Sequence, residues 1–360
     1  MKPQYELSWH FPRTELAKNY LKTLDLGGQT MAIFEERRKG KTEFLTDDLA
    51  PLAEDYGHRC CYVNFWEDKS SPVRSIVSGV ERSLAKELSG VLIGWKKELS
   101  LNLGGLTAKL TSNTEKDVHT AYQALDLLLK PKGTVLLQCD EIQHLATQPE
   151  FEIVAASLRT WIQANKDRVR VVFTGSSRDK LDRLFRNKKA AFYNSASIVV
   201  FPDMGYDFAE FLSNRFEYLT RRSLAPDDVM RAFLENHSSP AFIVELLQVM
   251  MREGVYSLDE GLEYFLANSR TDSANIEVWN NLKVLDRMVL SFLAQDNAGP
   301  LYSDAQTRIF SDKIGAKVTS SMVQASLQRL RDEEIVVNVS HGCWQIEDSD
   351  FKRFVLENDA

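Results

Sequence analysis

The sequence predicts an α/β fold with a parallel sheet, followed by helical domains, and two observations carry this prediction. From Gln29 to Phe201 short apolar runs alternate with longer amphipathic stretches, as expected when crossover helices cover both faces of a parallel sheet. After Pro202 the strand signals stop and amphipathic helices follow one another. With 360 residues, the chain is long enough for two or three domains.

Five runs rich in Val, Ile and Phe are the candidate strands. They are Met31–Phe34, Arg59–Phe65, Thr134–Cys139, Val169–Thr174 and Ser197–Phe201. A further segment, Leu99–Leu110, has period-two apolar spacing on both sides of a Gly-Gly pair, which predicts a β-hairpin. We expect this hairpin, at about residues 99–112, to be an insertion that projects from the core.

The C-terminal half predicts two helical modules. Residues Tyr206 to Leu266 indicate a small helical lid, and the polar stretch Asn268–Asn275 indicates a linker or domain boundary. Three helices and two short strands follow, in the order of a winged helix. They are Val284–Leu293, Ser303–Ile314, Ser320–Arg331, Ile335–Val339 and Cys343–Ile346. We therefore expect domains at residues 1–203, 204–272 and 273–360.

Composition excludes several classes of protein. The net charge of −7 gives no global sign of a nucleic-acid partner. The four cysteines form no CxxC pair, which favours free thiols in a reducing compartment. No apolar leader and no apolar stretch of membrane-spanning length is present, so we expect a cytoplasmic protein without a membrane partner. The six histidines show no metal-ligand spacing.

A glycine–lysine–threonine tripeptide follows the first predicted strand and precedes a predicted helix. The run reads Glu35-Glu36-Arg37-Arg38-Lys39-Gly40-Lys41-Thr42. In this context Gly40 would allow the backbone to approach phosphates, Lys41 would reach the β- and γ-phosphates, and Thr42 would bind Mg²⁺. The tripeptide alone carries little weight, because it also suits an ordinary helix start.

Two later strands supply the groups that decide this question. The third strand ends in Asp140-Glu141, of which Asp140 would hold Mg²⁺ and Glu141 would orient or deprotonate the attacking water. The fourth strand ends in Thr174-Gly175-Ser176, where Thr174 or Ser176 could report the γ-phosphate. A solvated strand end is the alternative for the acidic pair, but the ordered set favours a nucleotide site.

These segments resemble Walker A, Walker B and sensor 1 of the archaeal-type ATPase group within the AAA+/STAND P-loop proteins, relatives of origin-recognition and transposition-regulator ATPases. The resemblance covers most of the chain. It implies the sheet order 5-1-4-3-2, ATP with Mg²⁺ as ligands and nucleotide-controlled self-association. It also implies nucleotide-binding roles for a set of loop and lid residues, namely Arg37, Arg38, Lys39, Gly40, Lys41, Thr42, Glu43 and Pro240.

The sequence departs from that group at three places. Glu35 stands where the first Walker A glycine is expected. The arginine usually found before the fifth strand is absent, and the substitutes for a residue acting on a neighbouring copy are Arg178, Arg183 and Arg186. The lid motif reads Ser238-Ser239-Pro240 rather than Gly-x-Pro, so Pro240 is equally well explained as an ordinary first residue of a helix.

Two elements are candidates for contacting a macromolecule. The third winged-helix helix would turn polar side chains outward, with cations nearby; the set is Ser320, Ser321, Gln324, Gln328 and Arg331, with Lys313, Lys317 and Arg329. Acidic residues follow this helix, so a protein-docking role stands beside double-stranded DNA binding. The hairpin, flanked by Lys96, Lys97 and Lys109, is the second candidate.

The sequence thus predicts an ATP-binding and ATP-hydrolysing switch whose nucleotide state controls self-association, as a homo-oligomer, and engagement of DNA or a partner protein. Two alternatives stay open: a scaffold that holds nucleotide without turnover, and a winged-helix regulator with ATP as effector.

Overall fold

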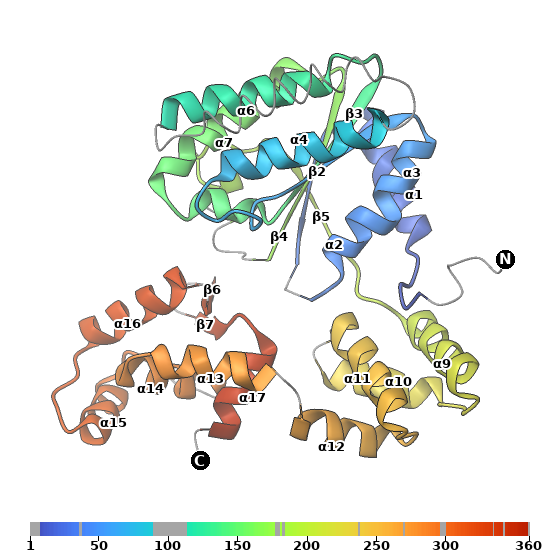
Figure 1. The fold of residues 1–360 in the computed structure, drawn as a ribbon. Helices are drawn as coiled ribbons and strands as arrows, with labels where there is room; N and C mark the ends of the chain where they lie inside the picture. The colour runs from blue at the N-terminus through green and yellow to red at the C-terminus, as the bar shows by residue number, and fades with distance from the viewer. Residues whose placement is uncertain are drawn as a thin grey trace. The chain divides into compact units, whose positions relative to one another are not determined.

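The computed structural model describes residues 8–35, 38–88, 114–176, 181, 184–236, 238–268, 271–295, 300–333, 335–340 and 343–358. The chain divides into two compact units (Figure 1). The first consists of residues 1–36 and 40–202, and the second of residues 37–39 and 203–360. The predicted hairpin around Gly104 and Gly105 lies outside the described residues.

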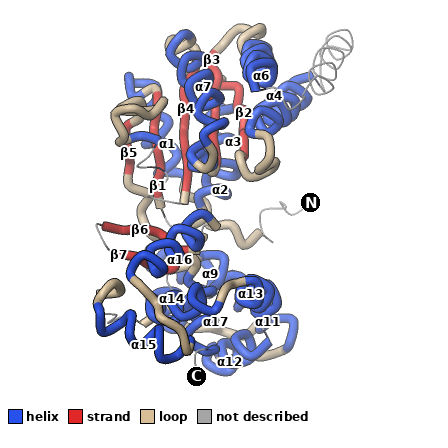
Figure 2. Tube along the Cα trace, turned by 90° about the vertical axis from the view of Figure 1, so that its left-hand side faces the viewer, coloured by secondary structure: helices blue, strands red, loops and turns tan. Residues whose placement is uncertain are grey.

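The first unit is built on a five-stranded parallel sheet (Figure 2). Its strands are β1 (Thr30–Phe34), β2 (His58–Asn64), β3 (Thr134–Asp140), β4 (Val169–Gly175) and β5 (Ser197–Val199). They lie in the order β2-β3-β4-β1-β5, which is the predicted order 5-1-4-3-2 read from the other edge. The predicted fold class is therefore confirmed, and each strand begins and ends within two residues of its predicted range.

Helices cover both faces of the sheet, which explains why the strands are almost continuously apolar. In β3 every residue after Thr134 is buried. One face packs into a core with α4 (Pro72–Leu88), α6 (Thr114–Leu128) and α7 (Glu152–Ala164). The other face packs against α1 (Thr14–Thr23) and the helix that follows β1.

The helix after β1 runs from Lys41 to Asp55 without a break. It consists of α2 (Lys41–Glu43), a π-helical stretch (Phe44–Leu49) and α3 (Ala50–Asp55). The π-helical stretch ends just before Pro51, whose ring nitrogen has no proton to donate to an earlier carbonyl. The buried Gln138 of β3 donates from Nε2 to the Leu45 carbonyl at 2.7 Å, which fastens this helix to the centre of the sheet.

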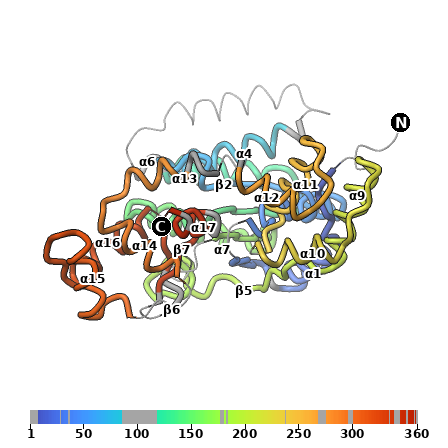
Figure 3. Tube along the Cα trace, turned by 90° about the horizontal axis from the view of Figure 1, so that it is seen from below, coloured from blue at the N-terminus to red at the C-terminus, as the bar shows by residue number. Residues whose placement is uncertain are grey.

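The second unit contains the predicted lid helices and winged-helix elements (Figure 3). The lid helices are α9 (Tyr206–Thr220), α10 (Pro226–Glu235), α11 (Pro240–Glu253) and α12 (Leu258–Asn268). The elements that follow are α13 (Thr271–Asn281), α14 (Val284–Ala294), α15 (Asp304–Ile314), α16 (Ser320–Asp332), β6 (Val336–Ser340), β7 (Cys343–Ile346) and α17 (Ser349–Asn358). Strands β6 and β7 pair antiparallel.

Two features of this unit differ from the prediction. In the stretch predicted as a linker or domain boundary, Asn268–Asn275, α12 ends at Asn268 and α13 begins at Thr271, so the stretch is largely helical rather than an irregular linker. The start of α13 is polar, and the helix packs against the core through a later residue. The Trp279 ring centroid lies 6.2 Å from that of Phe354. An additional helix, α17, supplies that phenylalanine and closes the C-terminal core.

The C-terminal core contains a buried acid. Asp286 of α14 is 3% exposed. It accepts hydrogen bonds from Ser326 Oγ and Arg329 Nη2 of α16, both at 2.5 Å. A buried carboxylate is tolerated when such donors surround it, so this cluster fixes α16 against α14.

None of the helices within the described part of the chain combines the length and the apolar character needed to cross a membrane.

We predict that Asp286→Ala lowers the free energy of unfolding by about 2–3 kcal/mol, because it leaves the buried Ser326 hydroxyl and the Arg329 guanidinium without their acceptor. Urea denaturation followed by circular dichroism measures this change. Asp312→Ala, on the exposed surface of α15, serves as the control and should change stability by less than about 0.5 kcal/mol. Equal losses in the two variants would contradict the assignment.

Candidate functional site

The loop after β1 reaches the carboxyl ends of β3 and β4. The Glu35 amide donates to the Gly175 carbonyl of β4 at 3.4 Å, so the loop starts beside that strand. Gly40 has φ 81° and ψ 23°, a left-handed conformation that costs glycine least. Its carbonyl accepts from the Phe44 amide at 3.0 Å, so the helix begins at this residue. The N-terminal amides of that helix are therefore placed at the sheet edge where ligands of parallel sheets bind.

Lys41 lies inside this loop. The residue is 6% exposed, and its ammonium donates to the Glu35 carbonyl at 2.7 Å. Glu35, which replaces the expected glycine, thus helps to position the lysine through its main-chain oxygen. A lysine at the start of a helix that follows a glycine loop is a suitable partner for a phosphate.

Asp140 is the centre of the site. It is 1% exposed, and its carboxylate accepts hydrogen bonds from three other elements. Thr42 Oγ1 and the Tyr62 hydroxyl donate to Oδ2 at 2.8 and 2.7 Å, and Thr174 Oγ1 donates to Oδ1. The Glu141 amide also donates to Oδ1, at 3.0 Å. The structure therefore brings the predicted Thr42, Asp140 and Thr174 together at one point.

The oxygen atoms at this point match the ligand preference of Mg²⁺. Thr42 contributes a hydroxyl and Asp140 a carboxylate, and hard divalent cations bind such oxygens. The arrangement fits the predicted metal role of these two residues, because both oxygens lie beside the glycine loop and its lysine.

Tyr62 of β2 was not predicted from the sequence. Burial, and then the nearby Asp140 carboxylate, raise the pKa of its phenol well above the usual value. The phenol therefore stays protonated and donates a hydrogen bond to Asp140. One signal was available, since Tyr62 and Asn64 are polar groups two residues apart at the carboxyl end of the strand.

Glu141 lies beside Asp140 but is held by different groups. Its backbone is left-handed, with φ 54° and ψ 40°, which turns the chain away from the β3 axis. Ser176 Oγ donates to Glu141 Oε2 at 3.2 Å, and the Gln143 side-chain amide donates to the same oxygen. The predicted Glu141 and Ser176 thus contact each other, and Gln143 joins them although no role was predicted for it.

The segment before α1 contacts the helix that follows the glycine loop. His10 Nε2 and the Arg13 amide each lie 3.0 Å from Oδ1 of Asp48, which is 8% exposed. The hydrogen bond to Asp48 raises the pKa of His10, although burial opposes this shift. The sequence showed no link between these residues, because 35 or more positions separate them from Asp48.

The other predicted residues belong to the chain around Gly40 and to α11. Arg37 is outside the described residues. Arg38 has a left-handed backbone, φ 63°, and is exposed, as is Glu43. Lys39 Nζ lies 3.0 Å from Asp203 Oδ1, so a carboxylate already accompanies this cation. Pro240 is the first residue of α11, after an N-cap formed by Ser239 Oγ and the Phe242 amide, and its contact with nucleotide stays a prediction.

The arginines considered for action on a neighbouring copy are described only in part. Arg178 and Arg183 lie outside the described residues. Arg186 is exposed, which leaves it accessible to a second molecule.

The surface of α16 is less basic than its composition suggests. Ser320, Ser321, Gln324 and Gln328 are exposed, as predicted. Arg331 instead lies over the Trp344 ring, 6.0 Å from its centroid. Arg329 is bound to the buried Asp286, so its charge is paired although its side chain is 38% exposed.

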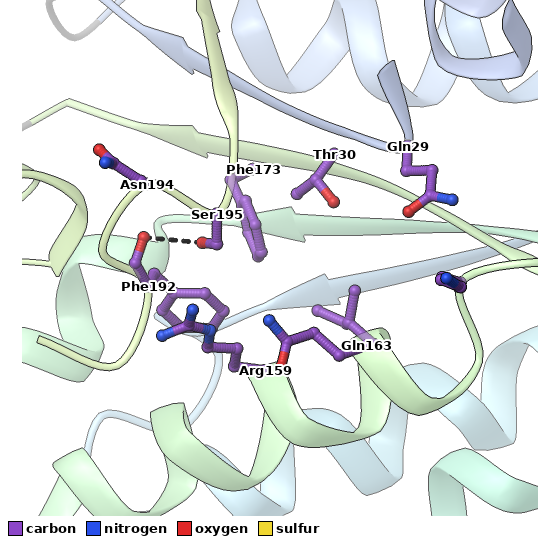
Figure 4. Close-up of a pocket in the computed structure, with 10 residues that line it drawn as sticks. Gln29, Thr30, Arg159, Gln163, Phe173, Phe192, Asn194 and Ser195 are labelled. Atoms are coloured by element: carbon purple, nitrogen blue, oxygen red, sulfur yellow. Dashed lines mark hydrogen bonds between the residues drawn. The ribbon is translucent and has the colours of Figure 1, made fainter. Parts of the chain in front are cut away.

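A separate cavity of about 480 Å³ lies at the opposite end of the strands (Figure 4). Gln29 and Thr30, where β1 begins, line it together with Asn194 and Ser195, which precede β5. The Ser195 hydroxyl donates to the Phe192 carbonyl at 2.7 Å. Ligands of open parallel sheets bind at the carboxyl ends of the strands, so this cavity is not the candidate site.

Comparisons with known proteins agree with this geometry at the level of the fold. No protein-family model and no curated protein matches the sequence. The Walker-type ATPase PABY2304 of Pyrococcus abyssi has a similar structure, with a TM-score of 0.64, 16% identity and 96% coverage of both chains. The ORC2 protein of Aeropyrum pernix in its ADP form gives 0.58, with 14% identity over 99% of this chain and 98% of that one. The resemblance predicted from the motifs is thus confirmed for the fold of the whole chain.

We predict that protonated His10 stabilises the protein through Asp48. Because the pKa of His10 is raised above its usual 6.5 in the folded state, this stabilisation is fully present below about pH 6.5 and is lost as the pH rises through the raised value. His10→Ala should therefore cost of the order of 1 kcal/mol at pH 6 and less at pH 8.5. Urea denaturation at the two pH values measures the difference.

The control is His119→Ala on α6, where the exposed imidazole contacts Gln123. It should show no comparable dependence on pH. A loss for His10→Ala that is the same at both pH values would contradict the ion pair.

Proposed function

We propose that this chain is an ATPase of the archaeal-type group within the AAA+/STAND proteins, and that its nucleotide state controls self-association and engagement of DNA or a partner protein. The observation that carries the proposal is the hydrogen bond of 2.8 Å between Thr42 of the glycine loop and the buried Asp140. Residues 98 positions apart meet there, at the sheet edge where a phosphate chain and its metal ion would be bound.

Each residue has a distinct task in this proposal. The Gly40 loop and the helix N-terminus bind phosphate oxygens through backbone amides, and Lys41 neutralises part of their charge. Thr42 and Asp140 hold Mg²⁺, which when bound supplies charge neutralisation at the phosphates. Tyr62 and Thr174 hold the Asp140 carboxylate in place. Thr174 thus positions a proposed metal ligand. The proposed role of sensing the γ-phosphate is therefore assigned to Ser176.

Glu141 is the proposed general base or water-orienting group. Its carboxylate lies one residue beyond Asp140 and is turned by the left-handed backbone toward the end of β4. A carboxylate fixed beside the phosphate-binding edge can accept a proton from, or orient, an attacking water. This assignment distinguishes the hydrolysing switch from a scaffold that only holds nucleotide.

The proposed switch function concerns the elements that follow the ATPase core. The lid helices α9 to α12 and the winged-helix elements stand after the ATPase core in sequence, and Pro240 of the lid is the proposed nucleotide contact. The neutral, exposed face of α16 fits docking to a protein at least as well as it fits binding to DNA, because the cations Arg329 and Arg331 are engaged within the module.

We predict that Lys41→Ala lowers ATP turnover by about 10²- to 10³-fold, since it removes a positive charge from the phosphate site. Phosphate release is measured with and without double-stranded DNA, and Lys132→Ala, an exposed lysine in the loop before β3, is the control. Stimulation by DNA that Lys41→Ala abolishes would support coupling to DNA. Wild-type turnover no higher than that of Lys41→Ala would refute hydrolysis and favour the nucleotide-holding scaffold.

We further predict that Glu141→Gln retains ATP binding, loses turnover by about 10²-fold or more and accumulates an ATP-dependent oligomer. Fluorescent-nucleotide titration and light scattering measure binding and mass. Glu150→Gln, an exposed substitution on the same stretch of chain, should behave like the wild type. An oligomeric state that changes neither on addition of ATP nor in Glu141→Gln would contradict the proposed switch.

A further inference from the structure

Three side chains at the carboxyl ends of β3 and β4 form a closed triangle of hydrogen bonds. Gln143 donates from Nε2 to Glu141 Oε2 and, at 3.2 Å, to Ser176 Oγ. Ser176 Oγ donates in turn to Glu141 Oε2 at 3.2 Å. Both protons of the Gln143 amide and the single proton of the serine hydroxyl are thereby used, so the donors and acceptors of the triangle are consistent.

The orientation of the Gln143 amide is set by its surroundings. The side chain is 0% exposed. The opposite orientation would place its carbonyl oxygen against the Glu141 carboxylate, which is unfavourable because both groups accept hydrogen bonds. In the observed orientation Oε1 is buried and has no hydrogen-bond partner among the described residues.

That buried acceptor argues against a purely structural role for Gln143. A buried acceptor without a donor is unfavourable, whereas an apolar side chain of the same shape would carry no such cost. A Cβ at Gly175 would lie 2.4 Å from Oε1, so a larger residue at position 175 would force the end of the Gln143 side chain to shift. The fold therefore keeps a space at the end of β4 for an amide with one unsatisfied atom.

The carboxylates of Asp140 and Glu141 accept side-chain hydrogen bonds from different residues, although the Glu141 amide also donates to Asp140. Thr42, Tyr62 and Thr174 hold Asp140, whereas Gln143 and Ser176 hold Glu141. The left-handed backbone of Glu141 separates the two sets. The orientation of Glu141 can therefore change without a change in the metal-binding carboxylate.

We infer that Gln143 is the positioning residue of this site: its amide holds the Glu141 carboxylate against Ser176 at the end of β4, in the orientation that hydrolysis requires. The inference rests on the proposed ATPase function. It also links Ser176 to Glu141: because Ser176 donates a hydrogen bond to Glu141, a shift of Ser176 would act directly on the Glu141 carboxylate.

The test begins with Gln143→Met, which keeps the length of the side chain and removes both donors. The expected result is a fall in kcat of about 10-fold or more, because a misplaced reacting group is costly, with KM and fluorescent-nucleotide affinity unchanged within about 2-fold. Gln148→Met, an exposed glutamine five residues further on, is the control. An unchanged or raised kcat in Gln143→Met would overturn the inference.

A double substitution separates action through Glu141 from a general disturbance. In single-turnover measurements, Gln143→Met should cause no further loss in a Glu141→Gln background, because residues that act as a unit are not additive. A full additional loss there would show that Gln143 acts elsewhere. A wild-type rate equal to that of Lys41→Ala would instead refute the proposed function itself, so the two failures are distinguishable.

A stability measurement tests the geometry without hydrolysis. Gly175→Ala should lower Tm by about 2–6 °C, because the new Cβ meets Gln143 Oε1 and, at 3.0 Å, Leu181 Cδ2. In a Gln143→Ser background the clash with the amide is absent, so the loss should be smaller. Equal losses in the two backgrounds would contradict the placement of Gln143 against Gly175.

Discussion

The organisation of the first unit depends on one buried carboxylate. Asp140 is almost fully enclosed, and a buried carboxylate is tolerated only when donors surround it. Its donors come from the loop after β1, from β2 and from β4. These elements are satisfied together only in the observed strand order, in which β3 lies between β2 and β4. The polar site and the apolar sheet therefore specify the same topology.

The helix after β1 shows how the core supports the site. Gln138 anchors this helix from the middle of β3, and Asp48 anchors the segment before α1 to it. The left-handed Gly40 then leads the chain into Lys41. Contacts on three sides thus fix the start of the helix, and preorganised amides and charges of this kind bind phosphate without reorganisation.

The second unit also contains a buried carboxylate whose donors hold two helices together. Asp286 is buried in the C-terminal core, and its acceptors are filled by Ser326 and Arg329 of α16. The arginine thereby pairs with a buried acid of the module, although its side chain stays partly exposed. This explains why a count of cations near α16 overestimates how basic that surface is.

The sequence by itself determined the strands, their parallel order through the resemblance, and the core of the candidate site. The strands and the site both carry local signals: apolar runs mark buried strands, Asp140, Glu141, Thr174 and Ser176 stand at strand ends, and Lys41 and Thr42 begin the helix that follows β1. Only the tertiary structure revealed the roles of Tyr62, Gln143 and Asp48, and the helix α13 within a polar stretch. A hydrogen bond between distant residues depends on strand register and on which side chains meet across elements. Periodicity within one segment carries no information about that partner, so these contacts were decided only when the chain folded.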